Sequence, residues 1–241
     1  MKKYLALIAI AVFLPSFAFA TIVSFKGNVS LKGAVHFASL PVDLPVGAYL
    51  FQGDSLTFGA PSGTNPPSLR VKNLLDAAGN SYSELTNFGI SGATLQQMIT
   101  GAPTTEDTHI GLYPGKKDIV IIWGGTNDIA GGQTLLVVES RLTNYVQGRK
   151  ALGAKVVVLT TIARDFNDGG ADEAVRQAYN AWIRANWNGS IGADKLVDVA
   201  ADSRFTNFSN ATYYQSDRTH LTAAGYSGIG DDIYAKLIPW Q

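Results

Sequence analysis

Short apolar runs alternate with stretches of helical periodicity along most of this chain, and this alternation constrains the fold more than any other feature. The segments DIVIIW at residues 118–123 and KVVVLTT at 155–161 are apolar at consecutive positions rather than at every second one. Such strands are buried on both faces, which is typical of a parallel sheet covered by helices. The predicted strands are residues 48–52, 85–88, 118–123, 155–161 and 196–199.

The segments between these runs carry apolar residues at helical spacing. The predicted helical stretches are residues 71–78, 95–99, 135–146, 175–182 and 226–237. Pro66 and Pro67 suit the first turn of one helix, and Gly153 suits the end of another. Alternating strands and helices predict an α/β fold with ligands bound at the carboxyl ends of the strands.

The composition favours one main domain with a neutral or weakly charged substrate. The 241 residues are 46% hydrophobic, enough for one sizeable core. Basic and acidic residues balance at 19 each, so no net field attracts nucleic acid or an anionic membrane. The absence of cysteine excludes disulfides, thiol catalysis, thiolate metal sites and lipid attachment after the leader.

Residues 1–20 have the features of a secretory signal peptide. Lys2 and Lys3 precede an apolar stretch at 4–14, and the small residues of AFA at 18–20 form a cleavage site. An uncleaved membrane anchor is the alternative, but Pro15 interrupts an apolar run that is short for a span. We expect a mature chain that begins at Thr21, is secreted or periplasmic, and has no stable membrane insertion.

Residues 21–46 form a predicted N-terminal β-ribbon ahead of the main domain at 47–241. The near-repeat VSFKGN-VSLKGA-VHFASL alternates apolar and polar positions, as a strand with one wet face does. A three-residue loop or one long bent strand keeps the apolar side chains on one face. An edge ribbon packed on the core is favoured over sugar binding or subunit contact.

Ser55 follows the first predicted strand of the main domain, in the segment GDSL, and raises the question of a serine nucleophile. A serine hydroxyl needs a base, an orienting acid and an oxyanion hole. Asp217 and His220, three residues apart in DRTH, form such an acid and base pair just before the last helix, which Thr222 can cap. The alternative is a surface histidine in a helix-capping turn.

Two further strand exits carry candidate oxyanion donors. The segment NFGISGATLQQM leaves the strand at 85–88 and is expected to enter a helix at Gly92, whose amide then points outward. Asn127, just past the strand at 118–123, offers a side-chain amide. Each feature alone is compatible with an ordinary turn.

Taken in order, GDSL, the glycine of SGA, GTND and DRTH resemble the motifs of the SGNH, or GDSL, hydrolases, over residues 49–237. This resemblance implies a three-layer α/β/α sandwich of flavodoxin-like type with a mainly parallel five-stranded sheet. It implies Ser55 as nucleophile, His220 as base and Asp217 as its partner. It also implies an oxyanion hole formed by the Ser55 amide, the Gly92 amide and the Asn127 side chain.

Other polar residues near these motifs are assigned to structure. Asp54 and Asp128 follow strands and are expected to bind loop amides. His36 and His109 have no partners at metal-ligand spacing, so neither a metal nor a cofactor is predicted. Thr57 stands where the G-x-S-x-G elbow of α/β-hydrolases has its second glycine, which argues against that fold.

The substrate depends on the loops at 101–117, 161–170 and 203–216. The last loop carries four aromatic residues that stack on a sugar, flank an acyl chain or only anchor the loop: Phe205, Phe208, Tyr213 and Tyr214. Without a long apolar lid, short acyl groups are favoured, such as acetyl esters of small molecules or carbohydrates. The alternatives are a non-catalytic carbohydrate-binding or surface-interaction module, and a peptidase, thioesterase or lysophospholipase.

Overall fold

The computed structural model describes residues 44–167 and 170–240. The predicted signal peptide and nearly all of the predicted ribbon lie outside these residues. One five-stranded sheet forms the centre of the described part, and its strands pair in parallel in the order β2-β1-β3-β4-β5. The strands are β1 (Val46–Gly53), β2 (Glu84–Asn87), β3 (Lys117–Trp123), β4 (Lys155–Leu159) and β5 (Lys195–Val197).

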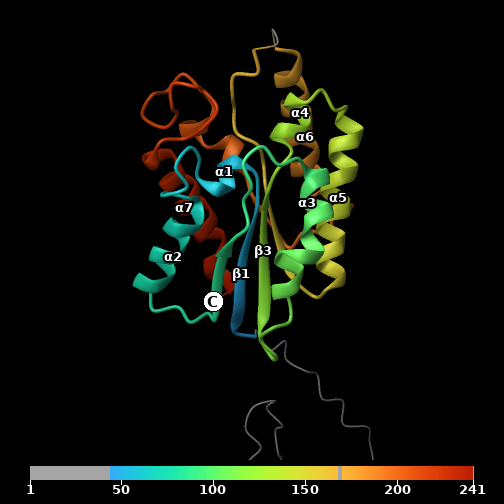
Figure 1. Cartoon of the computed structure of the whole chain (residues 1–241), viewed down its shortest axis with the longest axis vertical. Helices are drawn as coiled ribbons and strands as arrows, with labels where there is room; N and C mark the ends of the chain where they lie inside the picture. Colours follow the sequence, from blue (N-terminus) through green and yellow to red (C-terminus); the bar gives the residue numbers. More distant parts are fainter. Residues whose placement is uncertain (1–43, 168–169, 241) are drawn as a thin grey trace, which may run out of the picture. The chain divides into compact units, whose positions relative to one another are not determined.

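Helices cover both faces of the sheet, as expected for a three-layer sandwich (Figure 1). The helices are α1 (Ser55–Phe58), α2 (Pro67–Ala77), α3 (Leu95–Gly101), α4 (Thr126–Ala130), α5 (Leu135–Ala151), α6 (Ala171–Asn186) and α7 (Ala223–Leu237). Helices α2 and α7 lie on one face, and α3, α5 and α6 on the other. No helix of the described part is long and apolar enough to cross a membrane.

The side chains of β1 show why both faces need cover. Tyr49 and Phe51 pack into the cluster with α2 and α7, whereas Ala48 and Leu50 pack into the cluster with α3 and α5. Successive strand residues point to opposite faces, so an apolar run supplies both layers. Each large side chain buried in this way stabilises the fold by about 1.5–3 kcal/mol.

The helix ends follow the predicted signals. Pro67 is the first residue of α2, directly after Pro66. Gly153 follows α5 in the left-handed region, at φ +91°, where a side chain would be strained. Thr222 accepts a hydrogen bond from the Gly225 amide and caps α7.

Several element boundaries differ from the sequence-based expectation. β4 ends at Leu159 because the Thr161 amide donates to the Asn180 side chain instead of to a neighbouring strand. β5 ends at Val197, and a 3₁₀ turn, η3 (Val199–Ala201), follows. The expected loop at 101–117 contains two further 3₁₀ turns, η1 (Ala102–Thr104) and η2 (Glu106–His109). The short helices α1 and α4 were not predicted, because four or five residues show no periodicity.

Candidate active site

Ser55 is the first residue of α1, at the carboxyl end of the buried strand β1. Asp54 caps this short helix, and its Oδ1 accepts the Leu56 amide at 2.9 Å. Gly53 leaves no room for a side chain, because a Cβ there would collide with the Thr57 side chain and the Trp123 carbonyl. The turn therefore presents the Ser55 hydroxyl at the sheet edge while the residue is 8% exposed.

His220 and Asp217 come to this hydroxyl from the turn before α7. The His220 Nε2 lies 2.9 Å from the Ser55 Oγ, and the His220 Nδ1 lies 2.6 Å from the Asp217 Oδ2. The other carboxylate oxygen, Asp217 Oδ1, accepts the amides of Thr219 and His220 at 3.0 and 2.9 Å. The three side chains form one continuous hydrogen-bonded chain.

The charge state of Asp217 suits an orienting acid. Burial raises the pKa of Asp217. Hydrogen bonds from the His220 amide, the His220 ring and the Thr219 amide lower this pKa, and together they outweigh burial. The net pKa lies below the ordinary value for aspartate. A carboxylate that stays ionised can hold the Nδ1 proton of His220 and direct the Nε2 lone pair at Ser55.

The turn that carries His220 is held at both ends. The Gln215 amide donates to the His220 carbonyl at 2.9 Å, and the Asp165 amide donates to the Arg218 carbonyl at 3.0 Å. The Arg218 guanidinium also pairs with the Asp165 carboxylate at 3.3 Å. The loop after β4 is therefore attached to the loop that supplies the base.

Gly92 and Asn127 also lie at the carboxyl edge of the sheet, after β2 and β3. The expectation that a helix begins at Gly92 is wrong, because α3 begins at Leu95 and Thr94 caps it in a capping box with Gln97. Gly92 occupies the preceding turn at φ +79°, which a helix cannot contain. A Cβ at Gly92 would meet nothing within 4 Å, so the space beside it is open.

Each candidate oxyanion donor has an N–H group that no acceptor of the described residues uses. In the described part of the chain, the backbone amides of Ser55 and Gly92 donate to no acceptor. The Asn127 Nδ2 donates to the Ala93 carbonyl at 3.0 Å, which leaves its second proton for another acceptor. This bond also joins α4 to the turn of Gly92.

The two other carboxylates of these motifs bind backbone amides. Asp128 Oδ2 accepts the Leu95 amide at 2.8 Å, and Asp128 Oδ1 accepts the Arg141 guanidinium at 2.8 Å. Burial raises the pKa of Asp54 to about 7, against the opposing effects of the Leu56 amide and the Arg164 guanidinium. Both aspartates hold strand exits, as the sequence predicted.

A cavity of about 230 Å³ opens beside Gly92. Its lining residues come from the end of β1, the Gly92 turn, α3 and the position after η1: Gln52, Ile90, Ser91, Gly92, Ala93, Gln97, Met98, Gly101 and Thr105. This volume is smaller than that of most drug-sized ligand sites, which occupy about 300–1,000 Å³. The cavity has room for a small substituent of a ligand whose oxygen lies beside the Gly92 amide.

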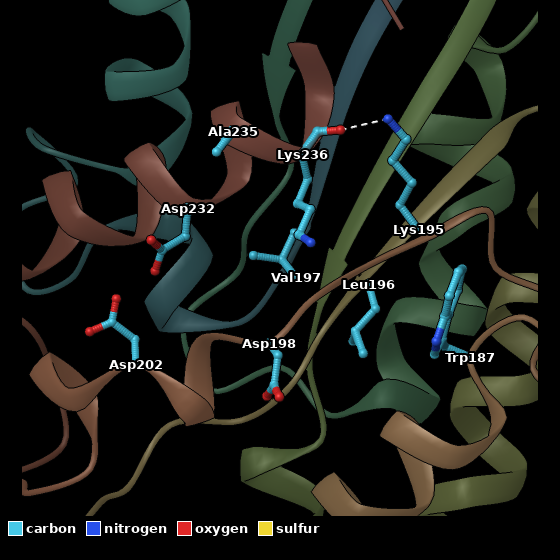
Figure 2. A pocket seen from close by; sticks show the side chains of 9 residues that line it. All are labelled: Trp187, Lys195, Leu196, Val197, Asp198, Asp202, Asp232, Ala235 and Lys236. Carbon is cyan, nitrogen blue, oxygen red and sulfur yellow. Dashed lines mark hydrogen bonds between the residues drawn. The ribbon is translucent and has the colours of Figure 1, made fainter. Parts of the chain in front are cut away.

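A larger cavity of about 770 Å³ lies along β5 (Figure 2). Its lining includes none of Ser55, Gly92, Asn127, Asp217 and His220. Three carboxylates line it, but Asp198 pairs with Arg184, and Asp202 and Asp232 both pair with Arg204. Lys195 Nζ donates to the Lys236 carbonyl across one end of the cavity. Its size alone does not make it a reactive site, since it has no nucleophile with an adjacent base.

The four aromatic residues of the loop at 203–216 differ in placement. Phe205 is fully buried in the core, so the expectation that it binds substrate is corrected to a packing role. Tyr213 packs edge-on against Phe205, with ring centroids 6.0 Å apart. Phe208 and Tyr214 line a cavity of about 410 Å³ with Arg218, although the Tyr214 hydroxyl donates to the Phe205 carbonyl.

Sequence reasoning overlooked Arg164, which follows β4 at the same edge of the sheet. A cationic residue just past a buried strand was the available signal. His109, expected in a loop, ends η2 and contacts the Glu84 carboxylate at 2.7 Å. Within residues 44–167 and 170–240, no cluster of three or more histidine, aspartate and glutamate side chains is arranged to hold a metal.

Solved structures with the same fold include several esterases. The psychrotrophic esterase EstA from Pseudoalteromonas sp. is 16% identical, with a TM-score of 0.61 over 80% of this chain and 97% of that chain. A family 3 carbohydrate esterase from Clostridium thermocellum is 21% identical, with a TM-score of 0.61 over 80% and 96%. A variant of Axe2, an acetyl-xylooligosaccharide esterase from Geobacillus Stearmophilus, is 19% identical, with a TM-score of 0.62 over 81% and 96%.

Among curated proteins, no sequence matches this chain. Residues 51–227 match the GDSL-like Lipase/Acylhydrolase family, and this match includes Ser55, Gly92, Asn127, Asp217 and His220. It covers most of the sequence and all of the sheet from the end of β1 onward. The chain therefore belongs to the GDSL-like Lipase/Acylhydrolase family and is a carboxylic ester hydrolase.

Proposed function

We propose that this protein is a secreted serine esterase in which Ser55, His220 and Asp217 form the catalytic triad. The observation that carries the proposal is the continuous hydrogen-bonded chain from Ser55 Oγ through the His220 ring to Asp217 Oδ2, at 2.9 and 2.6 Å. An inert module has no need for a buried serine hydroxyl facing an imidazole that a carboxylate orients.

In the first half of the reaction, Ser55 Oγ attacks the ester carbonyl and His220 Nε2 takes the hydroxyl proton. The carbonyl oxygen becomes an oxyanion, which accepts hydrogen bonds from the Ser55 amide, the Gly92 amide and the Asn127 side chain. His220 then gives its proton to the departing alkoxide. The alcohol leaves, and the acyl group remains on Ser55.

In the second half, water attacks the acyl-enzyme and His220 Nε2 takes a proton from that water. The same three donors stabilise the second tetrahedral intermediate. Its collapse releases the carboxylic acid and returns the proton to Ser55 Oγ. Asp217 stays ionised throughout and holds the Nδ1–H of His220. The cycle requires no cofactor.

Short acyl groups, of acetyl type, are the proposed substrates. The cavity of about 230 Å³ beside Gly92 supports this preference, because the acyl carbon is bonded to the oxygen that Gly92 would bind. The fold is shared with proteins described as a carbohydrate esterase and an acetyl-xylooligosaccharide esterase. An acetyl ester of a small alcohol or a carbohydrate is therefore the class to test first.

The test uses purified chain from Thr21 onward, assayed on p-nitrophenyl esters of increasing acyl length. We expect the highest kcat/KM on the acetate or propionate ester, and no enzymatic release in Ser55→Ala or His220→Ala. A maximum at long acyl chains would instead favour a lysophospholipase, and faster turnover of an acetyl thioester would favour a thioesterase. A folded wild-type chain that cleaves none of these would contradict the proposal and favour a binding module.

Secretion is proposed from the sequence of residues 1–20 and has its own test. The full-length chain is expressed in a bacterial host, and the N-terminus of the exported protein is sequenced. We expect export and a first residue of Thr21. Retention of residues 1–20 on a membrane-associated product would favour an uncleaved anchor.

A further inference from the structure

Within residues 44–167 and 170–240, Arg164 differs from the other arginines because no carboxylate lies within ion-pairing distance of its guanidinium. The other arginines each pair with at least one carboxylate: Arg70, Arg141, Arg149, Arg176, Arg184, Arg204 and Arg218. Among the described residues, Arg164 has one long hydrogen bond, from Nη1 to the Thr126 Oγ1 at 3.4 Å. Its Nε is buried and has no acceptor in the part of the chain that the structure describes.

The buried Nε is unfavourable without an acceptor, although the Arg164 side chain as a whole is only partly buried. A guanidinium carries five N–H donors and remains protonated in proteins. Burying such a group without hydrogen-bond acceptors costs free energy, and most buried polar groups are therefore paired. Burial lowers the pKa of Arg164, although nearby Asp54, Asp217 and Asp172 oppose this effect through their charge.

The strand order places Arg164 next to the proposed reaction centre. Gly92 follows β2, Ser55 follows β1, Asn127 follows β3 and Arg164 follows β4, and these strands are neighbours in that order. Thr126, which Arg164 contacts, is adjacent to Asn127 in sequence. Arg164 thus lies on the opposite side of Ser55 from Gly92 and its small cavity.

The guanidinium is also held in place on its own loop. It lies over the Phe166 ring, with Cζ 5.1 Å from the ring centroid. The next residue, Asp165, is bonded through its amide and its carboxylate to Arg218, in the turn of His220. A planar cation with fixed orientation and unused donors is suited to bind a carboxylate through two parallel hydrogen bonds.

We propose that Arg164 binds a carboxylate on the alcohol part of the ester, while the short acyl group occupies the cavity beside Gly92. This inference rests on the proposed function, because it assumes attack by Ser55. The acyl and alcohol parts leave the reacting carbon in different directions, and Gly92 and Arg164 mark two such directions. The protein would then prefer acetyl esters of acidic alcohols, such as hydroxy acids or acidic sugars.

The alternative is that Arg164 only compensates the charge of Asp54. In that case its loss would change the rates on charged and neutral esters by the same factor. The discriminating quantity is therefore the ratio of kcat/KM for an anionic ester to that for a neutral ester of similar size. Comparing this ratio between variants cancels the intrinsic reactivity of the two leaving groups.

The experiment compares 4-acetoxybenzoate with 4-acetoxybenzamide in the wild-type chain and in Arg164→Met, Arg164→Lys and Arg184→Met. We expect Arg164→Met to lower the anionic-to-neutral ratio about tenfold or more, the effect of losing a charge-assisted pair. Arg164→Lys should retain part of the ratio. Arg184→Met removes the same charge from an ion pair with Asp198 and should leave the ratio unchanged.

An unchanged ratio in Arg164→Met would overturn the inference, and so would an equal loss on both esters. Where Arg164→Met fails to fold by circular dichroism, Arg164→Gln is measured in its place. Activity on p-nitrophenyl acetate separates failure of the proposed esterase function from failure of the proposed role of Arg164. A folded wild-type chain without that activity contradicts the proposed function, whereas a chain with that activity but no change in ratio contradicts the role of Arg164 alone.

Discussion

The two turns that meet at the candidate active site are built in opposite ways. The turn at Ser55 continues a buried strand, and its Asp54 is 1% exposed. The turn at His220 lies on the surface, where the Asp217 side chain is 49% exposed and the Arg218 side chain 55% exposed. The first is held by the sheet, whereas the second is held by hydrogen bonds within and between loops.

The aspartates of the two turns illustrate the difference. Burial raises the pKa of Asp54 to about 7, while hydrogen bonds from His220 and Thr219 outweigh burial and lower the pKa of Asp217. Both residues are close to the same serine, yet one is a helix cap that resists ionisation and the other a carboxylate that remains charged. Position relative to the core, and not residue type, decides their chemistry.

The largest expected effect comes from breaking the contact between the two turns. Ser55→Ala and His220→Ala should each lower kcat by on the order of 10⁵-fold or more, because attack and proton transfer act as one unit. The double variant should be no slower than either single variant, as measured on p-nitrophenyl acetate. Additive losses would mean that the two residues do not act together.

Asp217→Asn should lower kcat by about 10³–10⁴-fold, because an amide does not hold His220 in the required tautomer. The midpoint of urea unfolding should change little, since this side chain is half exposed and its amide bonds within the turn can be kept by asparagine. Asp128→Asn provides the matched control, because that carboxylate binds Leu95 and Arg141. We expect it to destabilise the fold more than Asp217→Asn and to lower kcat less.

Asn127→Ala should lower kcat by about 10²–10³-fold, the effect of removing one oxyanion donor. KM should change much less, because the donor is most important when the charge develops in the transition state. The loss of the bond to the Ala93 carbonyl is a structural effect, which the unfolding midpoint measures separately. A rise in KM with unchanged kcat would assign Asn127 to ground-state binding instead.

Asp54→Asn should have the smallest effect on rate and a clear effect on the pH dependence of stability. In the folded chain the pKa of Asp54 is about 7, above the ordinary value of 3.8, so the folded state binds more protons between these values. The protonated carboxyl group of Asp54 makes its full contribution to the free energy of unfolding below about pH 4. This contribution is lost as the pH rises toward 7, and the loss amounts to about 4 kcal/mol.

Urea unfolding at pH 4 to 8 measures this dependence. Asp54→Asn should remove the part of the decline that Asp54 contributes, whereas Ser55→Ala, which retains Asp54, should keep it. Asp232, whose pKa burial raises to about 6, contributes a further part that should remain in both variants. The asparagine side chain can still accept the Leu56 amide, so the helix cap is preserved. An identical pH dependence in wild type and Asp54→Asn would contradict burial as the cause of the raised pKa.

Strand cores were predictable because burial on both faces requires consecutive apolar residues, as in the segment at 118–123. The ends of the strands were harder to predict from the sequence. The pattern predicts that β4 reaches Thr161, but the strand ends at Leu159 because the Asn180 side chain binds the Thr161 amide. The helix expected at Gly92 begins at Leu95, because Thr94 and Gln97 form its capping box. Both errors arise from side-chain contacts that a pattern of hydrophobicity does not encode.

The alternation that makes a parallel α/β sheet, the order of the motifs GDSL, SGA, GTND and DRTH, and the family could all be recognised in the sequence. These properties depend on local periodicity and on short motifs. Only the tertiary structure decided that Ser55 and His220, 165 positions apart, lie within hydrogen-bonding distance. It also decided that Asp54 is buried, that Phe205 packs in the core, and that Arg164, among the arginines of the described residues, forms no ion pair with a carboxylate. Each of these depends on which distant side chains become neighbours, and that is set by the order in which the strands pair.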